Sequence, residues 1–370
     1  MTSGLRAWPA LAWAAALYAC LAIVIALTIG PRASPPPGAM AGDQQVYRAM
    51  AAHPLALDPA DLKAPWCWRV LPSLIVRATG LGPDLGFHVL TVTSFALLPA
   101  AVMVLLLALR VSPLTAGLIG GVAATVPPLA GYLAWAYAMT DAFAVLVCVG
   151  AVWSTVTRRA VPLAVCLVAL ALTKETWIVT AAFAVLWTRA HHRPWLPRVL
   201  VIIAVAALVN VSLRFAIHPS ESYSALRAAQ GLYLPLSMSN ILRRLLLATG
   251  TTWNVLTPIL ALSLARLWRG GTGIALAVPI ALAMLQPLVA TETIRPVASA
   301  YPFVLIACAL ELDRWSPGWR RVAGGVVIAA QFPWLLEFGY VAHFPLRGIE
   351  IALVLTAVVL IPFGWRRPAA

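Results

Sequence analysis

The feature that most constrains this chain is a series of apolar runs, each about as long as a helix that crosses a lipid bilayer. Runs such as 10–29, 85–109 and 199–217 are dominated by Ala, Leu, Val and Ile. A membrane-spanning helix needs roughly 20 mostly apolar residues. Only 10% of the residues are charged, against about a quarter in a typical soluble domain. The sequence therefore predicts an all-α polytopic transmembrane helical bundle, with residues 1–370 forming a single transmembrane domain.

Arginine-rich breaks between the apolar runs predict the topology. They begin at Arg6 and Arg110 and recur at 158–159, 189–198 and beyond, and basic residues favour the cytoplasmic side. With every break on that side, we expect a multi-pass protein of the inner (plasma) membrane with both termini in the cytoplasm. The breaks also explain the net charge of +14 without a nucleic-acid partner. The predicted spans, about ten in number, are 9–30, 85–109, 114–127, 139–157, 199–217, 240–265, 272–290, 297–312, 322–341 and 348–365.

Two segments depart from simple spans. Residues 160–188 begin and end at Arg-rich breaks, but they are too short for two full crossings at about 1.5 Å per residue. We expect a short helical hairpin there, with its tip at "TKET" (173–176). In the predicted outer loop 31–84, residues 66–80 mix Trp and Arg with apolar residues, which is typical of an amphipathic helix lying in the membrane interface.

Under this topology the acidic residues gather on the outer side. All of the twelve acidic residues except Glu311 and Asp313 lie at or near that side. The orientation was derived from arginine alone, and acidic residues contribute little to orientation. A binding or reaction surface that faces outward is the explanation we favour.

The stretch "GDQQVYRAM" (42–50) places Asp43, Tyr47 and Arg48 in the first and largest outer loop. A carboxylate at this position can act as a general base toward a hydroxyl group. It can also simply cap a helix. We favour the base for Asp43, with Tyr47 and Arg48 as substrate-binding candidates.

Further polar residues stand at predicted outer span ends. Asp141 suits either an N-cap or a functional acid. Lys174 and Glu175 are adjacent on the hairpin tip, so they need not neutralise each other; each can form a salt bridge to another span or contact substrate. Glu292 and Arg295 lie in "ETIRP", where an arginine can grip phosphate in a bidentate manner or anchor at the interface.

Arg69, in "WRVLP", is another candidate phosphate ligand, although it can equally anchor to anionic lipid headgroups. The histidines show no metal-ligand spacing, and the cysteines show no pairing pattern. No Gly-rich phosphate loop is present. We therefore predict no cofactor; a divalent metal is compatible with the sequence but not indicated by it.

Four short motifs together resemble the GT-C glycosyltransferases, in a small bacterial-type branch. They are "GDQQVY", "WRVLP", "LALTKET" and "ETIRP". The resemblance implies an integral-membrane enzyme that moves a sugar from a polyprenyl-phosphate donor to a lipid or glycan acceptor of the cell envelope. It also implies that Asp43 is the general base and that Lys174 and Arg295 hold the donor phosphate. Many relatives carry a second acid beside the first and an outer soluble domain, and neither is seen here.

A membrane transporter or lipid flippase is the alternative function. Lys174 and Glu175 would then be intramembrane coupling charges. That class predicts an inverted repeat, and we find none in the sequence. A non-catalytic scaffold is a third class, but it leaves the outer polar clusters without a role.

Overall fold

The computed structural model describes residues 8–29, 42–53, 66–125, 140–218, 239, 253, 256–286 and 298–339. These residues form thirteen α-helices and short 3-10 turns, with no strand among them. The prediction of an all-α chain is therefore confirmed. Apart from the helical hairpin described below, the helices of the bundle are α2 (Trp8–Ile29), α5 (Pro83–Ala108), α6 (Pro113–Ala124), α8 (Asp141–Val156), α11 (Leu196–Ala216), α14 (Leu256–Leu267), α15 (Gly271–Leu285), α17 (Tyr301–Leu312) and α18 (Pro317–Gly339).

These helices coincide with most of the predicted spans. Agreement is close where both ends are described, as for α5 against the predicted 85–109 and α8 against 139–157. Most of the first part of span 240–265, and all of 348–365, lie outside the described residues. Among the residues that the structure describes, two helical stretches are long and apolar enough to cross a membrane, Pro83–Ala108 and Arg193–Ala216.

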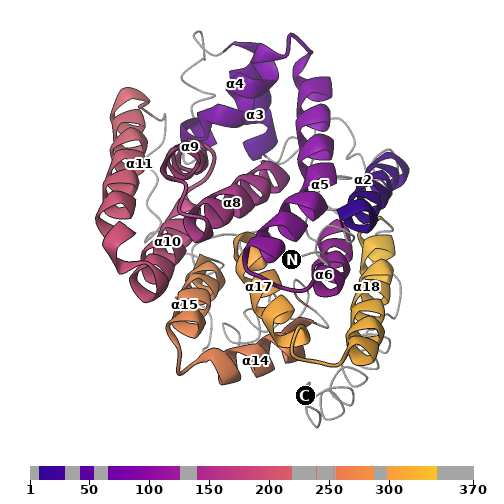
Figure 1. Cartoon of the computed structure of the whole chain (residues 1–370). Coiled ribbons are helices and arrows are strands. Elements are labelled where there is room, and N and C mark those ends of the chain that lie inside the picture. Colours follow the sequence, from indigo (N-terminus) through magenta and orange to yellow (C-terminus); the bar gives the residue numbers. More distant parts are fainter. Residues whose placement is uncertain are drawn as a thin grey trace.

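The core of the bundle surrounds α17, which lies among α5, α6, α8, α14 and α15 (Figure 1). Almost every residue of α17 is buried. Phe303 packs against Phe183, with ring centroids 5.2 Å apart, and aromatic pairs at this spacing stabilise a core beyond the area they bury. Gly120 lets α6 approach α5, because a Cβ atom there would meet the Met103 side chain at 2.7 Å.

The predicted hairpin is confirmed as two helices, α9 (Ala160–Ala171) and α10 (Trp177–His191), that meet at the turn 172–176. Lys174 and Glu175 therefore lie in the turn itself rather than on a helix. A turn lets neighbouring side chains diverge toward different parts of the protein.

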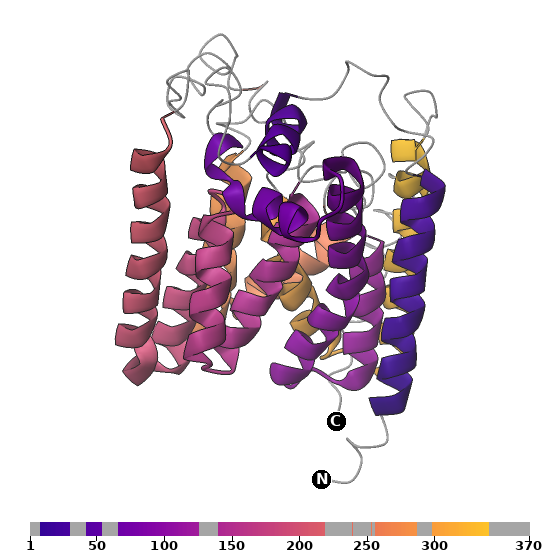
Figure 2. The same cartoon turned by 90° about the horizontal axis from the view of Figure 1, so that it is seen from above.

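A small second layer lies across one end of the bundle (Figure 2). It consists of α3 (Gly42–Ala52), the 3-10 turn η3 (Trp66–Trp68) and α4 (Val70–Ala78), so residues 66–80 are largely helical as predicted. Its own apolar cluster joins Tyr47, Val76 and Phe87. Gly86 brings α4 onto α5, because a Cβ at this position would lie only 2.4 Å from Val76 Cγ1. The layer is thus packed onto the bundle rather than attached only through the chain.

Candidate functional site

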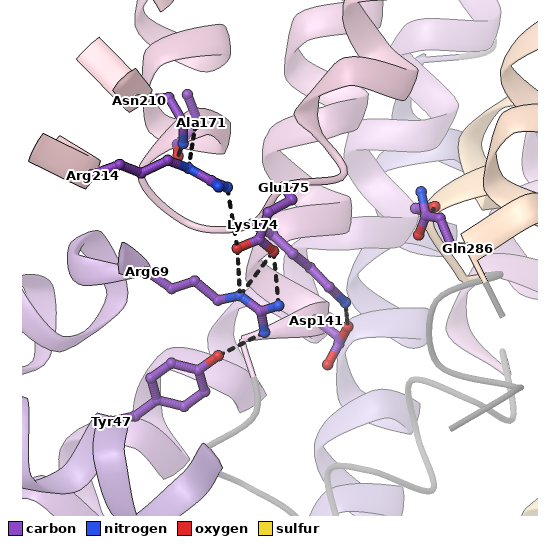
Figure 3. Close-up of polar contacts among 10 residues, drawn as sticks. Tyr47, Arg69, Asp141, Ala171, Lys174, Glu175, Asn210, Arg214 and Gln286 are labelled. Carbon is purple, nitrogen blue, oxygen red and sulfur yellow. Dashed lines mark hydrogen bonds and ion pairs between the residues drawn. The ribbon is translucent and has the colours of Figure 1, made fainter. Parts of the chain in front are cut away.

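Polar side chains from five separate segments meet beneath the α3–α4 layer (Figure 3). The segments are α3, the η3–α4 junction, the start of α8, the α9–α10 turn and the last turns of α11. Since α8 and α10 begin at this end while α9 and α11 finish at it, their directions alone bring these residues together. We call this group the hairpin-tip cluster; its members are Tyr47, Arg69, Asp141, Lys174, Glu175, Asn210 and Arg214.

Arg69 is the centre of the hairpin-tip cluster. Its Nη2 and Nε donate to Glu175 Oε2 at 2.7 and 3.1 Å, and its Nη1 donates to the Tyr47 hydroxyl at 2.9 Å. Two donors of one guanidinium thus grip one carboxylate, which is a strong and directional arrangement. Arg69 is buried, and its contacts join α3 to the hairpin tip.

Electrostatics keep this pair charged. Burial by itself would raise the pKa of the Glu175 carboxyl, but Arg69, and to a smaller extent Arg214, bring that pKa below its ordinary value. Burial would likewise lower the pKa of Arg69, and the Glu175 carboxylate raises it instead. In this pair Arg69 is buried and Glu175 is half-buried, and removing Glu175 would leave the buried guanidinium without its carboxylate, which is costly. Arg69 and Glu175 therefore fix the position of α3 relative to the tip of the hairpin.

Arg214 is the member that the sequence analysis did not single out. Its guanidinium lies 3.9 Å from Glu175 and 4.4 Å from the centre of the Trp68 ring, in a cation–π arrangement. Asn210 accepts a hydrogen bond from Arg214 Nε at 3.2 Å. The available signal was a lone arginine at the predicted outer end of a span, the side that basic residues normally avoid.

Lys174 points away from Glu175 and pairs with Asp141, the first residue of α8 (Figure 3). Both side chains are buried. The neighbouring cavity, lined in part by Cys148 and Thr180, measures about 10 Å³, roughly the space of one water molecule. In the structure Lys174 therefore forms the salt bridge to another helix that was one of its two interpretations.

The other candidate residues lie apart from the hairpin-tip cluster or outside the part of the chain that the structure describes. Arg48 forms an exposed ion pair with Asp84 at 2.6 Å, and exposed pairs contribute little to stability. Asp43 is the second residue of α3, one helical turn before Tyr47, but its side chain lies outside the described part. Glu292 and Arg295 also lie outside the described residues.

Within the described ranges, no group of three His, Cys, Asp or Glu residues is arranged to hold a metal ion. Comparison with protein-family models, with curated proteins and with solved structures returns no match. The function is therefore argued from the site alone.

Proposed function

We propose that the protein is a membrane glycosyltransferase that transfers a sugar from a polyprenyl-phosphate donor to a lipid or glycan acceptor. The observation that supports this function best is the convergence of three cations and two carboxylates at one end of an apolar helical bundle. Arg69, Lys174 and Arg214 are the cations, and Asp141 and Glu175 the carboxylates. This cluster lies directly beneath α3, the helix that carries Asp43.

We place the cluster on the extracytoplasmic side, with both termini in the cytoplasm. The described acids support this choice, because Asp84, Asp141 and Glu175 lie at the end that carries α3. Glu311 and Asp313 lie at the other end, among the Arg-rich breaks. The outward apolar residues of α11, such as Leu208 and Phe215, are 66% and 74% exposed, which suits contact with lipid tails.

In the proposed reaction, the Asp43 carboxylate takes the proton of an acceptor hydroxyl. The acceptor oxygen forms a bond to the anomeric carbon, and the bond from that carbon to the lipid phosphate breaks. Negative charge then develops on the departing phosphate. Stabilising charge where it develops is usually the largest single contribution to catalysis.

Arg214 is the described cation that we assign to this phosphate. Its side chain is 38% exposed and its contact with Glu175 is long, at 3.9 Å, so its donors remain accessible to a ligand. Lys174 is buried against Asp141, and we assign it a secondary role. Arg295 remains the other proposed phosphate ligand.

Arg69 and Glu175 act as positioning residues in this proposal. Arg69 holds the Tyr47 hydroxyl, and Ser73 donates a hydrogen bond to the Tyr47 carbonyl oxygen at 3.1 Å. Both contacts fix α3, and hence Asp43, over the hairpin tip. Groups that react must be held within a fraction of an ångström of the productive geometry.

The test incubates the purified full chain with radiolabelled polyprenyl-phosphate sugars and an extract of envelope lipids. Transfer of label to the acceptor, or slow release of free sugar, would support the proposal. Gln45→Ala, an exposed change in α3, is the matched control for variants of Asp43. Movement of labelled lipid across a vesicle membrane with no sugar transfer would support the transporter instead.

A further inference from the structure

A larger cavity lies at the opposite end of the bundle. Helices α5, α8 and α10 all begin near the hairpin-tip cluster and end at this cavity; along the 16 residues of α8 this is about 24 Å. Its volume is about 580 Å³, within the range of small-molecule sites. We call it the basal cavity; the lining residues used below are Arg110, Arg158, Trp187, His191, His192 and Arg314.

The lining of the basal cavity is basic. Its described residues include three arginines and two histidines, and none of them is acidic. The Glu311 carboxylate at this end already accepts hydrogen bonds from Arg266 at 2.7 Å and from Trp315 Nε1 at 3.1 Å. Arg314 lies 4.0 Å from it. The cavity therefore carries an excess of positive charge that favours an anion.

Two of its arginines are not engaged elsewhere. In the part of the chain that the structure describes, the side chains of Arg110 and Arg158 make no hydrogen bond or ion pair. By contrast, Arg266 and Arg320 at the same end bind Glu311 and Asp313 at 2.7 and 3.0 Å. Carboxylates are thus present at this end of the bundle, but they form ion pairs with other arginines.

The backbone gives a second, independent indication. Arg110 and Arg158 have φ values of +64° and +58°, at helix ends where glycine or asparagine is the usual residue. Both helix ends have the same type of hydrogen bond, from a backbone N–H to the carbonyl oxygen five residues earlier. These bonds are Val111 N to Leu106 O at 3.0 Å and Arg159 N to Ser154 O at 2.9 Å. After α4, a similar position is filled by Gly80, with φ of +71°. Because arginine in this conformation costs energy, backbone preference alone does not explain why arginine occupies both positions.

An aromatic contact supports one side of the lining. Trp187 is buried, and its ring lies beside one of the two histidines. The ring packs against His191 at 4.3 Å between centroids. Partial burial and, to a smaller extent, the positive charge of Arg158 lower the pKa of His192.

We propose that the basal cavity binds a phosphate group, supplied either by an anionic lipid headgroup or by a free phosphate compound. Arg110 and Arg158 would grip the phosphate oxygens, with Arg314 and the two histidines lining the same cavity. Arginine suits this task because its planar fork matches two phosphate oxygens at once. The site is independent of the proposed glycosyltransferase reaction and lies at the other end of the molecule.

Two measurements on the full chain in non-ionic detergent separate the sources. Calorimetry follows inorganic phosphate and pyrophosphate, with chloride at equal ionic strength as the reference. Native mass spectrometry follows phosphatidylglycerol retained in competition with phosphatidylcholine. Saturable binding in either arm, weakened at least about tenfold by Arg110→Asn with Arg158→Asn, is the expected result.

The controls address folding and bulk charge. Asparagine tolerates the left-handed backbone, so the double variant should fold at least as well as the native chain. Arg321→Gln, an exposed change at the same end, should not weaken binding. No binding in either arm, equal binding by the double variant, or an equal loss in Arg321→Gln would overturn the site.

Discussion

The two ends of this molecule use arginine in opposite ways. At the hairpin-tip cluster, Arg69 is buried and its guanidinium is shared between Glu175 and Tyr47. At the basal cavity, Arg158 is exposed, has a costly backbone conformation, and forms no side-chain hydrogen bond or ion pair with any residue that the structure describes. Paired charges fix the positions of chain segments, whereas unpaired charges are available to a ligand. The difference suggests that the first end is built for precise placement and the second for capture of an anion.

The largest expected effect is on catalysis at the hairpin-tip end. Asparagine keeps the size of Asp43 but cannot accept a proton at neutral pH. Asp43→Asn should therefore bind donor normally while sugar transfer falls by roughly two to four orders of magnitude. Asparagine caps a helix about as well as aspartate. Near-native turnover of Asp43→Asn, compared with the Gln45→Ala control, would show that Asp43 caps α3 and is not the general base.

The next effect tests whether buried pairs at this end are structural. Lys174→Met leaves the Asp141 carboxylate buried beside an apolar side chain. We expect a loss of about 3–5 kcal/mol in the free energy of unfolding. The double variant Lys174→Met with Asp141→Leu removes both charges, so it should recover most of the lost free energy of unfolding. If denaturant titration shows the single variant to be as stable as the native chain, the pair is not structural.

A smaller effect concerns ligand affinity at Arg214. Arg214→Gln should weaken binding of the polyprenyl-phosphate donor at least about tenfold, the loss of one charged hydrogen bond of about 1.5–3 kcal/mol. Arg198→Gln is the matched control, because Arg198 is exposed at the other end of α11. Equal donor affinity for Arg214→Gln and the native chain, by equilibrium binding, would place the phosphate elsewhere, with Arg295 next to be tested.

The pH dependence of stability should also differ between native and Glu175→Gln protein. The folded-state pKa of Glu175 lies below the ordinary value of 4.5, so the ionised pair stabilises the fold fully above that value. The contribution is lost as the pH falls through the lower, folded-state pKa. The difference in melting temperature between the two proteins should therefore shrink from pH 7 toward pH 3. A constant difference would contradict the charged pair.

The smallest effect belongs to the basal end. Arg158→Asn should raise the free energy of unfolding by up to about 1 kcal/mol, because asparagine relieves a left-handed strain. Arg159→Asn, at the adjacent exposed residue with an extended backbone, should not stabilise the fold. Lower stability of Arg158→Asn in chemical denaturation would show that the arginine side chain supports the fold, and the contrast between the two ends would weaken.

Sequence reasoning was most successful where local pattern decides structure. The helices α2, α5, α8 and α11 follow from unbroken apolar runs. In an apolar environment the backbone N–H and C=O groups of such a run must hydrogen-bond to each other, and a helix allows this. The hairpin α9–α10 follows from Arg-rich ends set too close together and a polar "TKET" between two apolar stretches. These features depend only on neighbours in the chain, so one sequence is sufficient to predict them.

The tertiary structure decides which charged side chains form ion pairs with one another. Nothing in the sequence shows that Lys174 binds Asp141 while its neighbour Glu175 binds Arg69, because those partners lie 33 and 106 residues away. The directions of α8, α9 and α11 bring these side chains to one end. The basal cavity likewise arises from helix ends that are distant in sequence. The sequence determined which residues are apolar enough to form helices and where charge is permitted, whereas packing alone decided which charges meet and which remain open to a ligand.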